Sequence, residues 1–210
     1  MRAVVIGSGE IKDGNIIKKY CENSFVICCD GGMGYALKEN IRPDVILGDM
    51  DSVRKDELEY YEKKGFEMKK YPREKDYTDM ELGIDEALKT DAGEVILLGA
   101  AGSRLDHTIM NIQLLKKIAE KGKKAKLIND NNIISLIDSK IEISGKKGDI
   151  VSLIPFTEKV CGICTRGLEY SLNAYIMTMG HSIGISNVMK EEKAEITIKQ
   201  GLLLVIQAWD

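Results

Sequence analysis

The chain has 210 residues, 44% of them hydrophobic and 30% charged, so it can bury the core of one large domain or two small ones. Its formal net charge of −3 is too small to favour a nucleic-acid partner, and its apolar runs are too short to span a membrane. The N-terminal sequence MRAVVIGSGE enters a strand pattern without a small-residue cleavage site, which argues against a signal peptide. We therefore expect a cytoplasmic protein that binds neither membranes nor nucleic acid.

The first part of the chain, residues 1–131, alternates short apolar runs with helix-like segments. This alternation predicts an α/β domain with an open, mostly parallel sheet flanked by helices, whose ligands bind beyond the carboxyl ends of the strands. In the last predicted helix, Ile109, Ile112, Leu115, Ile118 and Ala119 fall at helical spacing and predict one apolar face. The predicted strands are Ala3–Ile6, Phe25–Cys29, Val45–Leu47, Phe66–Tyr71, Val95–Leu98 and Ala125–Ile128, and the predicted helices are Asn15–Glu22, Tyr35–Asn40, Lys55–Lys64, Asp79–Lys89 and His107–Lys121.

The second part, residues 132–210, has a different pattern of short runs rich in β-branched residues, separated by turn signals. No helix of normal length fits it, so we expect a small antiparallel β-sandwich or barrel. The predicted strands are Ile133–Ile137, Lys140–Ile143, Ile150–Pro155, Val160–Thr165, Ile183–Ser186, Glu195–Lys199 and Leu202–Gln207.

Acidic residues follow two of the predicted parallel strands. Asp30 and Gly31 come directly after Phe25–Cys29, where the glycine allows close approach of a ligand to the backbone. Asp49 and Asp51 follow Val45–Leu47 two residues apart, and paired carboxylates of this kind suit a hard cation such as Mg²⁺. The alternative interpretation is structural, with Asp30 as a helix cap and with Asp51 or Ser52 opening the next helix.

A third acidic segment, KDYTDME, begins at Lys75. Thr78 and Glu81 match a capping box, which explains part of the segment whatever else it does. Capping does not explain Asp76 and Asp79, which we take as further metal ligands, and Lys75 adds a cation of the kind that binds phosphates.

A fourth segment, GAAGSRLDH, follows the strand Val95–Leu98 and opens the longest helix. Gly102, Ser103 and Arg104 stand where backbone N–H groups, the helix dipole and a guanidinium bind an anion. The segment matches neither the GxxxxGK[ST] nor the GxGxxG pattern. Structural interpretations of its last two residues make Asp106 the helix N-cap and His107 a buried hydrogen-bonding residue rather than a base. Together the four segments predict a magnesium and phosphate site at one edge of the sheet.

The five cysteines are expected to be reduced. Cys161 and Cys164 have the CxxC spacing, but no second ligand pair lies nearby in the sequence, so plain thiols are favoured over a redox or zinc site.

The same segments resemble the thiamin pyrophosphokinase family over almost the whole chain. CDGGMGYAL, PDVILGDMDSV, KDYTDMELGIDEAL and GAAGSRLDHTIMNIQLL are similar to its N-terminal motifs in order and spacing, and VSLIPF, GLEYSL and GISNVM to those of its β domain. The resemblance implies transfer of a pyrophosphoryl group from ATP to the hydroxyethyl group of thiamine, giving thiamine diphosphate and AMP. It also implies a Mg²⁺-dependent homodimer with thiamine at the subunit interface.

The resemblance also carries roles onto individual residues. Asp49, Asp51, Asp76 and Asp79 match acidic positions associated with magnesium and catalysis. Thr78, Arg104 and Asp106 match positions near the nucleotide phosphates, and Ser186 and Asn187 match a pair on the thiamine side. The only tryptophan, Trp209, is expected to pack at the C-terminus rather than bind thiamine.

The chemistry fits the residues, because Mg²⁺ and Arg104 would stabilise the charge on the phosphate oxygens while one carboxylate accepts the proton of the alcohol. Two alternatives stay open at this point. One is a different Mg²⁺-dependent enzyme on the same fold, such as a pterin pyrophosphokinase or a nucleotide hydrolase. The other is a non-catalytic nucleotide- or vitamin-binding regulator.

Overall fold

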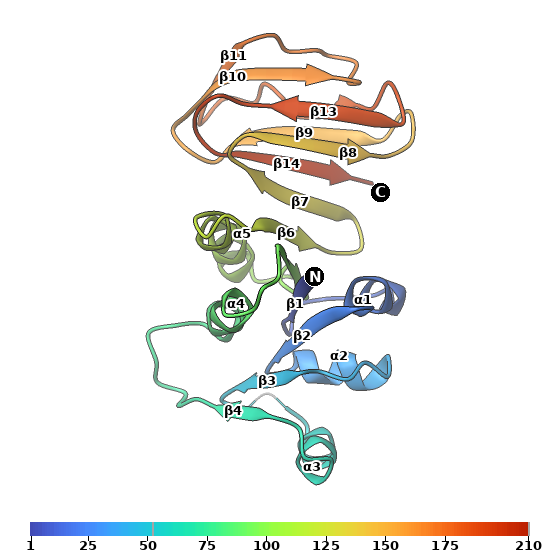
Figure 1. Ribbon diagram of the computed structural model, residues 1–210, viewed down its shortest axis with the longest axis vertical. Coiled ribbons are helices and arrows are strands. Elements are labelled where there is room, and N and C mark those ends of the chain that lie inside the picture. Colours follow the sequence, from blue (N-terminus) through green and yellow to red (C-terminus); the bar gives the residue numbers. More distant parts are fainter. Residues whose placement is uncertain (52, 210) are drawn as a thin grey trace. The chain divides into compact units, whose positions relative to one another are not determined.

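A computed structural model describes residues 1–51 and 53–209 (Figure 1). The chain divides into two compact units, Met1–Asp130 and Asn131–Asp210, called here the α/β unit and the β unit. In the part of the chain that the structure describes, no helix is long and apolar enough to cross a membrane.

The α/β unit is built on a parallel sheet with strand order β4-β3-β2-β1-β5-β6. Its strands correspond to the predicted apolar runs, and the residues of β1 and β5 after the first are buried on both faces, which explains why those runs do not alternate. The strand β4 is shorter than predicted. The bounds are Arg2–Ile6 for β1, Ser24–Cys29 for β2, Val45–Gly48 for β3, Met68–Lys70 for β4, Glu94–Leu98 for β5 and Lys124–Ile128 for β6.

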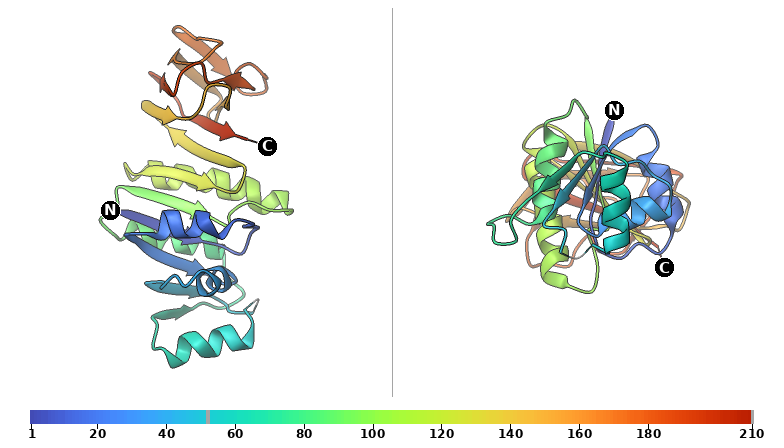
Figure 2. Two further views of the ribbon diagram at one scale, coloured as in Figure 1. Left: turned by 90° about the vertical axis from the view of Figure 1, so that its right-hand side faces the viewer. Right: turned by 90° about the horizontal axis from the view of Figure 1, so that it is seen from below.

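Helices cover both faces of this sheet, as the alternating pattern predicted. The helices α4 and α5 lie together on one face and α1 and α2 on the other (Figures 1 and 2). The bounds are Gly14–Cys21 for α1, Gly32–Lys38 for α2, Lys55–Lys63 for α3, Asp79–Leu88 for α4 and Leu105–Ala119 for α5.

The buried face of α5 differs from the predicted apolar face. Ile109 is 55% exposed, and the buried side chains are Asn111, Leu114, Leu115 and Ile118. The predicted stripe was therefore correct at Leu115 and Ile118 but wrong at Ile109. A polar residue, Asn111, occupies the buried face near the start of the helix.

The β unit contains two antiparallel groups of strands, with orders β12-β9-β14-β7 and β11-β10-β13-β8. The described residues 131–209 contain no helix, so the predicted all-β architecture is confirmed. The bounds are Asn132–Ile137 for β7, Lys140–Ser144 for β8, Ile150–Pro155 for β9, Lys159–Arg166 for β10, Tyr175–Thr178 for β11, Asn187–Val188 for β12, Lys193–Thr197 for β13 and Leu203–Ala208 for β14.

One predicted strand of the β unit is wrong. Residues 183–186 form a turn, and the short strand β12 begins only at Asn187. Ile183 and Ile185 are both exposed, so the apolar pattern there does not mark a buried strand face. The strand β11 was not predicted.

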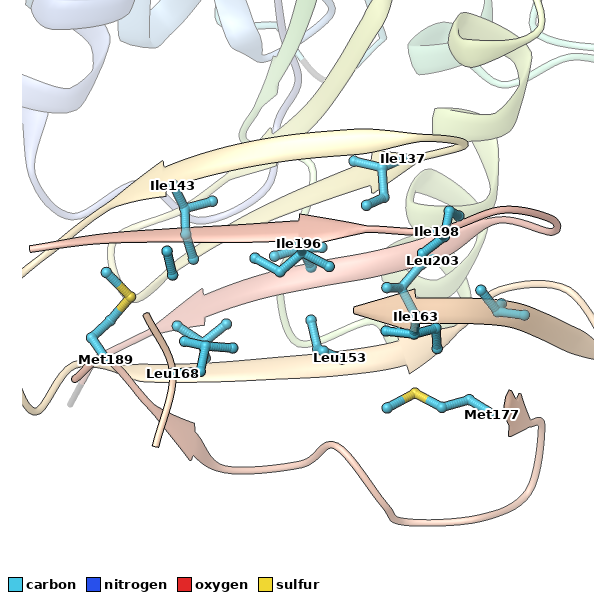
Figure 3. Packing of buried hydrophobic residues seen from close by; sticks show 14 residues of the cluster. Ile137, Ile143, Leu153, Ile163, Leu168, Met177, Met189, Ile196, Ile198 and Leu203 are labelled. Atoms are coloured by element: carbon cyan, nitrogen blue, oxygen red, sulfur yellow. The ribbon is translucent and has the colours of Figure 1, made fainter. Parts of the chain in front are cut away.

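The core of the β unit is a cluster of aliphatic and methionine side chains from both groups of strands (Figure 3). Leu153 of β9, Ile163 of β10 and Ile196 of β13 are completely buried in it. Alternation along the strands supplies these inward residues, as β9 shows with Val151, Leu153 and Pro155 buried in turn.

Candidate functional site

A cavity of about 710 Å³ lies in the α/β unit beyond the carboxyl ends of β1, β2 and β5. Cavities of this size hold nucleotide-sized ligands, and this edge of an open α/β sheet is where such ligands bind. Its lining comes from four segments: the loop after β1, the end of β2 with Asp30, the start of α4, and the loop leading into α5. Three of these segments were predicted as site segments, and the loop after β1 was not.

The missed loop, Gly7-Ser8-Gly9-Glu10, is held against the loop after β5. The N–H of Gly7 donates to the carbonyl of Leu98 at 2.9 Å, and the N–H of Gly9 donates to that of Gly99 at 2.8 Å. A Cβ on Gly9 would stand 2.6 Å from the carbonyl oxygens of both Gly99 and Ala101, so a side chain there would force the loops apart. The signal in the sequence was the Gly-Ser-Gly directly after the first strand.

The end of β2 places Asp30 in a constrained turn. Asp30 has a φ of 44° and Met50 one of 63°, in the left-handed region that non-glycine residues rarely adopt. The N–H of Met50 donates to Asp30 Oδ1 at 3.3 Å. That oxygen lies 1.8 Å from where a Cβ on Gly48 would stand, so only glycine at position 48 leaves room for the carboxyl group.

The Asp30 carboxyl group lies beside the carboxyl group of Asp79, the first residue of α4. Burial, together with the proximity and charge of Asp79, raises the pKa of Asp30 from its ordinary value of 3.8 to about 7, and the charge of Asp49 adds to the shift. Sequence reasoning assigned Asp30 to the nucleotide and Asp79 to the metal, and the structure brings the two together.

Asp79 Oδ1 is a buried oxygen that accepts no hydrogen bond from the described residues. The ammonium of Lys75 lies 3.2 Å away, close enough for an ion pair but outside hydrogen-bonding geometry. Buried acceptors are normally satisfied, so this atom and the neighbouring carboxyl group of Asp30 fit the binding of a cation. Lys75 also donates to the carbonyl of Pro72 at 3.2 Å.

The other predicted metal ligands do not form a ready-made cage. Within residues 1–51 and 53–209, no group of three or more acidic, cysteine or histidine side chains is placed to hold a metal. Mg²⁺ is commonly held by only one or two carboxylates together with substrate phosphates, and the Asp30 and Asp79 pair fits that mode. The four-aspartate set of Asp49, Asp51, Asp76 and Asp79 stays a prediction.

Asp49, Asp51 and Asp76 lie outside the lining of the cavity. Asp49 Oδ1 accepts the N–H of Asp51 at 3.0 Å, and the exposed Asp51 carboxylate lies 3.7 Å from the guanidinium of Arg73. Asp76 is exposed. Asp51 does not open α3, because the N-cap of that helix is Arg54, and the alternative cap Ser52 lies outside the described residues.

The glycine loop after β5 carries the predicted anion-binding residues to the cavity. Gly102, Ser103, Arg104 and His107 all line it. The N–H of Gly102 donates to the hydroxyl of Thr108 at 3.1 Å, and that hydroxyl donates to the carbonyl of Arg104, which ties the loop to the first turn of α5.

Two structural interpretations of this segment are corrected. Asp106 is not the N-cap of α5, because the helix begins at Leu105 with Arg104 as its N-cap. Asp106 instead pairs with Arg104, whose Nε donates to Asp106 Oδ1 at 3.2 Å, and this contact lowers the pKa of Asp106. His107 is exposed at the cavity rather than buried.

The remaining residues of the α/β site have local roles. The side chain of Thr78 caps α4 by accepting the N–H of Glu81 at 3.2 Å, as predicted, whereas the carboxylate of Glu81 pairs with Lys117. Gly31 is the N-cap of α2 and lies against Ser8. Thr78 also lines the cavity.

In the β unit, the predicted thiamine pair has one buried and one exposed member. The amide of Asn187 bonds both backbone groups of Tyr170, accepting its N–H at 3.0 Å and donating to its carbonyl at 2.7 Å. Ser186 is exposed, with a φ of 56°. Exposed apolar side chains gather in the sequence between residues 170 and 185: Tyr170, Tyr175, Ile176, Met179, Ile183 and Ile185.

The cysteines are all free thiols within the described residues. Cys161 lies within an irregularity of β10 between Val160 and Ile163, where Gly162 has a φ of 70°, and Cys164 follows it. Cys164 Sγ accepts the N–H of Ala174 at 3.2 Å. Trp209 is partly exposed, and its backbone pairs with Asn131.

Two family models match the chain. Residues 17–127 match the model described as thiamin pyrophosphokinase, catalytic domain. Residues 138–203 match thiamin pyrophosphokinase, vitamin B1 binding domain. The cavity with its carboxyl pair thus lies in the part of the chain that is similar to the catalytic domain.

Curated proteins and solved structures agree with these matches. The chain is 32% identical over 192 residues to the thiamine pyrophosphokinase of Bacillus subtilis, and the aligned region covers 90% of this chain and 89% of that protein. It is 29% identical to thiamine pyrophosphokinase 1 of Arabidopsis thaliana, with 86% and 76% covered. The crystal structure of the Bacillus subtilis protein covers all of both chains with a TM-score of 0.92 at 28% identity. That of the Geobacillus thermodenitrificans protein has a TM-score of 0.88 at 26% identity, covering 100% of this chain and 98% of that one.

Proposed function

Because the chain belongs to the thiamin pyrophosphokinase family, we propose that it transfers a pyrophosphoryl group from Mg-ATP to the hydroxyethyl group of thiamine, giving thiamine diphosphate and AMP. The observation that carries this proposal is the cavity at the carboxyl ends of the parallel strands, where the Asp30 and Asp79 carboxyl groups face glycine loops and a helix N-terminus. Acidic and anion-binding groups together suit a magnesium-bound triphosphate.

The phosphates of the nucleotide would bind along the loops after β1 and β5. The glycines of both loops let a ligand approach the backbone closely, and the N-terminus of α5 adds its partial positive charge. Arg104 is exposed, and in the described part of the chain its guanidinium pairs only with the exposed Asp106, so a phosphate can compete for it.

Asp30 and Asp79 would hold the magnesium ion, with Asp49, Asp51 and Asp76 as the further acidic residues expected from the sequence. When bound, this ion would neutralise charge on the phosphate oxygens as the β-phosphorus is attacked. One carboxylate of the group would take the proton of the thiamine hydroxyl, and general-base help of this kind contributes about 10²–10⁴-fold to the rate. Lys75, 3.2 Å from Asp79, keeps a positive charge beside the pair.

Thiamine would bind through the β unit, which is similar to the vitamin B1 binding domain. We further propose that the active protein is a homodimer with thiamine at the subunit interface, near Ser186. The exposed apolar side chains between residues 170 and 185 support an interface, since a monomer rarely leaves such a group in water. Asn187 would act there by fixing the backbone of Tyr170. The cytoplasmic location stays a prediction from the sequence.

The test is a product assay with the purified full chain, Mg²⁺, ATP and thiamine. We expect AMP and thiamine diphosphate in equal amounts, and no AMP when thiamine is omitted or replaced by a pterin alcohol. Release of ADP or phosphate without thiamine would instead identify a nucleotide hydrolase. Binding of both ligands without AMP formation would identify a regulator, and either outcome would refute the proposal.

A further inference from the structure

Asn111 is a buried polar residue on the face of α5 that lines the cavity. Its side chain is only 7% exposed. Buried amides normally have both ends hydrogen-bonded, because an unpaired polar group in the interior costs free energy. The partners of Asn111 therefore indicate what its position requires.

Among residues 1–51 and 53–209, only one end of this amide has a hydrogen-bond partner. Nδ2 donates to the carbonyl of Ala100 at 2.7 Å, which fixes the orientation of the group. Oδ1 of Asn111 has no hydrogen-bond partner among the described residues. It is not fully buried either, because Asp79 Oδ1 is the only fully buried side-chain nitrogen or oxygen there that lacks a partner. Asn111 Oδ1 is consequently open to the cavity. In contrast, both ends of the buried amide of Asn187 are bonded to Tyr170.

The position of Asn111 along α5 indicates which part of a nucleotide it meets. Arg104 is the N-cap of α5, and at 1.5 Å per residue Asn111 lies about 10 Å further along the helix. Phosphates bound at the N-terminus of α5 would leave the nucleoside at about this distance. Because a carbonyl oxygen accepts hydrogen bonds and cannot donate them, its partner must carry an N–H or O–H group.

We propose that Asn111 is a specificity-determining residue whose Oδ1 accepts a hydrogen bond from the nucleoside part of the triphosphate. The donor is either the exocyclic amine of adenine or a ribose hydroxyl. This inference rests on the proposed function, because it takes the cavity to be the nucleotide site. The bond to Ala100 gives the acceptor a fixed direction before the ligand arrives, and such preorganisation lowers the cost of binding.

The experiment measures equilibrium binding of four magnesium triphosphates to the full chain without thiamine: ATP, its analogue lacking the 6-amino group, 2′-deoxy-ATP and 3′-deoxy-ATP. Asn111→Leu removes the acceptor at similar size. We expect this variant to bind ATP about 10–100-fold more weakly, because the ligand's donor is left unpaired in a buried site. One of the three analogues lacks the group that donates to Asn111 Oδ1. For that analogue, Asn111→Leu should change the dissociation constant less than about 2-fold.

Thr108→Val is the matched control. It loosens the same face of α5 by removing the hydroxyl bonds to Gly102 and Arg104, but it removes no free acceptor. It should weaken all four ligands by one common factor. If Asn111→Leu does not fold, Asn111→Ala makes the same comparison.

Two outcomes would overturn the inference. Equal weakening of all four ligands by Asn111→Leu would show that Asn111 only supports Ala100, and unchanged ATP binding would show that no ligand donor meets it. In both cases the wild-type chain would still form thiamine diphosphate from ATP, so the proposed function would remain valid. A wild-type chain that binds no nucleotide would overturn the proposed function as well, so the two failures are distinguishable.

Discussion

In the β unit the buried amide of Asn187 has both ends bonded to the backbone of Tyr170, whereas in the α/β unit the buried Oδ1 of Asp79 accepts no hydrogen bond from the described residues. The same contrast separates Asn187 from Asn111, whose Oδ1 opens into the cavity. Polar groups that are satisfied internally stabilise the fold. Polar groups left unsatisfied cost stability and indicate where a ligand completes the structure.

The largest expected effect on stability concerns the core of the β unit. Leu153→Ala removes a completely buried side chain and should lower the free energy of unfolding by about 2–5 kcal/mol. Urea denaturation of the full chain measures it. The control Ile176→Ala removes a side chain that is 56% exposed and should change the stability of the monomer by less than about 0.5 kcal/mol. Similar losses in both variants would contradict the assignment of the core.

The next effect concerns catalysis in the α/β unit. Gly48→Ala would place a Cβ on the Asp30 carboxyl group and displace it, so kcat/KM for thiamine diphosphate formation should fall about 10²-fold. Gly93→Ala is the matched control, because no atom lies within 4 Å of the new Cβ. Unaltered kinetics in Gly48→Ala would mean that the position of Asp30 does not matter.

A smaller effect separates the two members of the predicted thiamine pair. Asn187→Ala leaves the backbone groups of Tyr170 unpaired and should cost about 1–3 kcal/mol of stability. Ser186→Ala should leave stability nearly unchanged and raise the KM for thiamine. Thermal unfolding together with thiamine kinetics checks both expectations. A stable Asn187→Ala variant with a raised KM would make Asn187 a direct thiamine ligand instead.

A further predicted effect is a pH dependence of stability. Because the pKa of Asp30 is about 7 in the folded protein and near 3.8 in the unfolded chain, its contribution is fully present below about pH 4 and is lost as the pH rises through 7. Asp30→Asn cannot titrate, so in chelator the variant should gain stability relative to the wild type between pH 4.5 and pH 8. A pH-independent difference between the two would argue against the carboxyl pair.

The sequence predicted the strands well because buried apolar runs are local features. It was wrong at Ile183–Ser186, where Ile183 and Ile185 give an apolar pattern but remain exposed. The acidic and glycine loops were also predicted, since each directly follows a strand. The pairing of Asp30 with Asp79 was not, because it depends on how α4 is placed against β2.

The loop after β1 and Asn111 were missed for the same physical reason. Gly7 and Gly9 gain their meaning only from carbonyl groups of the distant loop after β5, such as those of Gly99 and Ala101. Asn111 lies within a helix predicted from its apolar residues, and its role depends on its bond to Ala100 in another segment. Contacts between segments far apart in the chain define these parts of the site.

The central claim is that the Asp30 and Asp79 pair serves pyrophosphoryl transfer rather than the fold. Its most direct test is thiamine diphosphate formation by Asp79→Asn, with Asp91→Asn as an exposed aspartate of the same unit outside the cavity. We predict that Asp79→Asn lowers turnover by at least about 10²-fold while the circular dichroism spectrum stays that of a folded chain, because a ligand of the metal and of the transition state is lost. Asp91→Asn should behave as wild type. Turnover of Asp79→Asn close to that of the wild type would contradict the account.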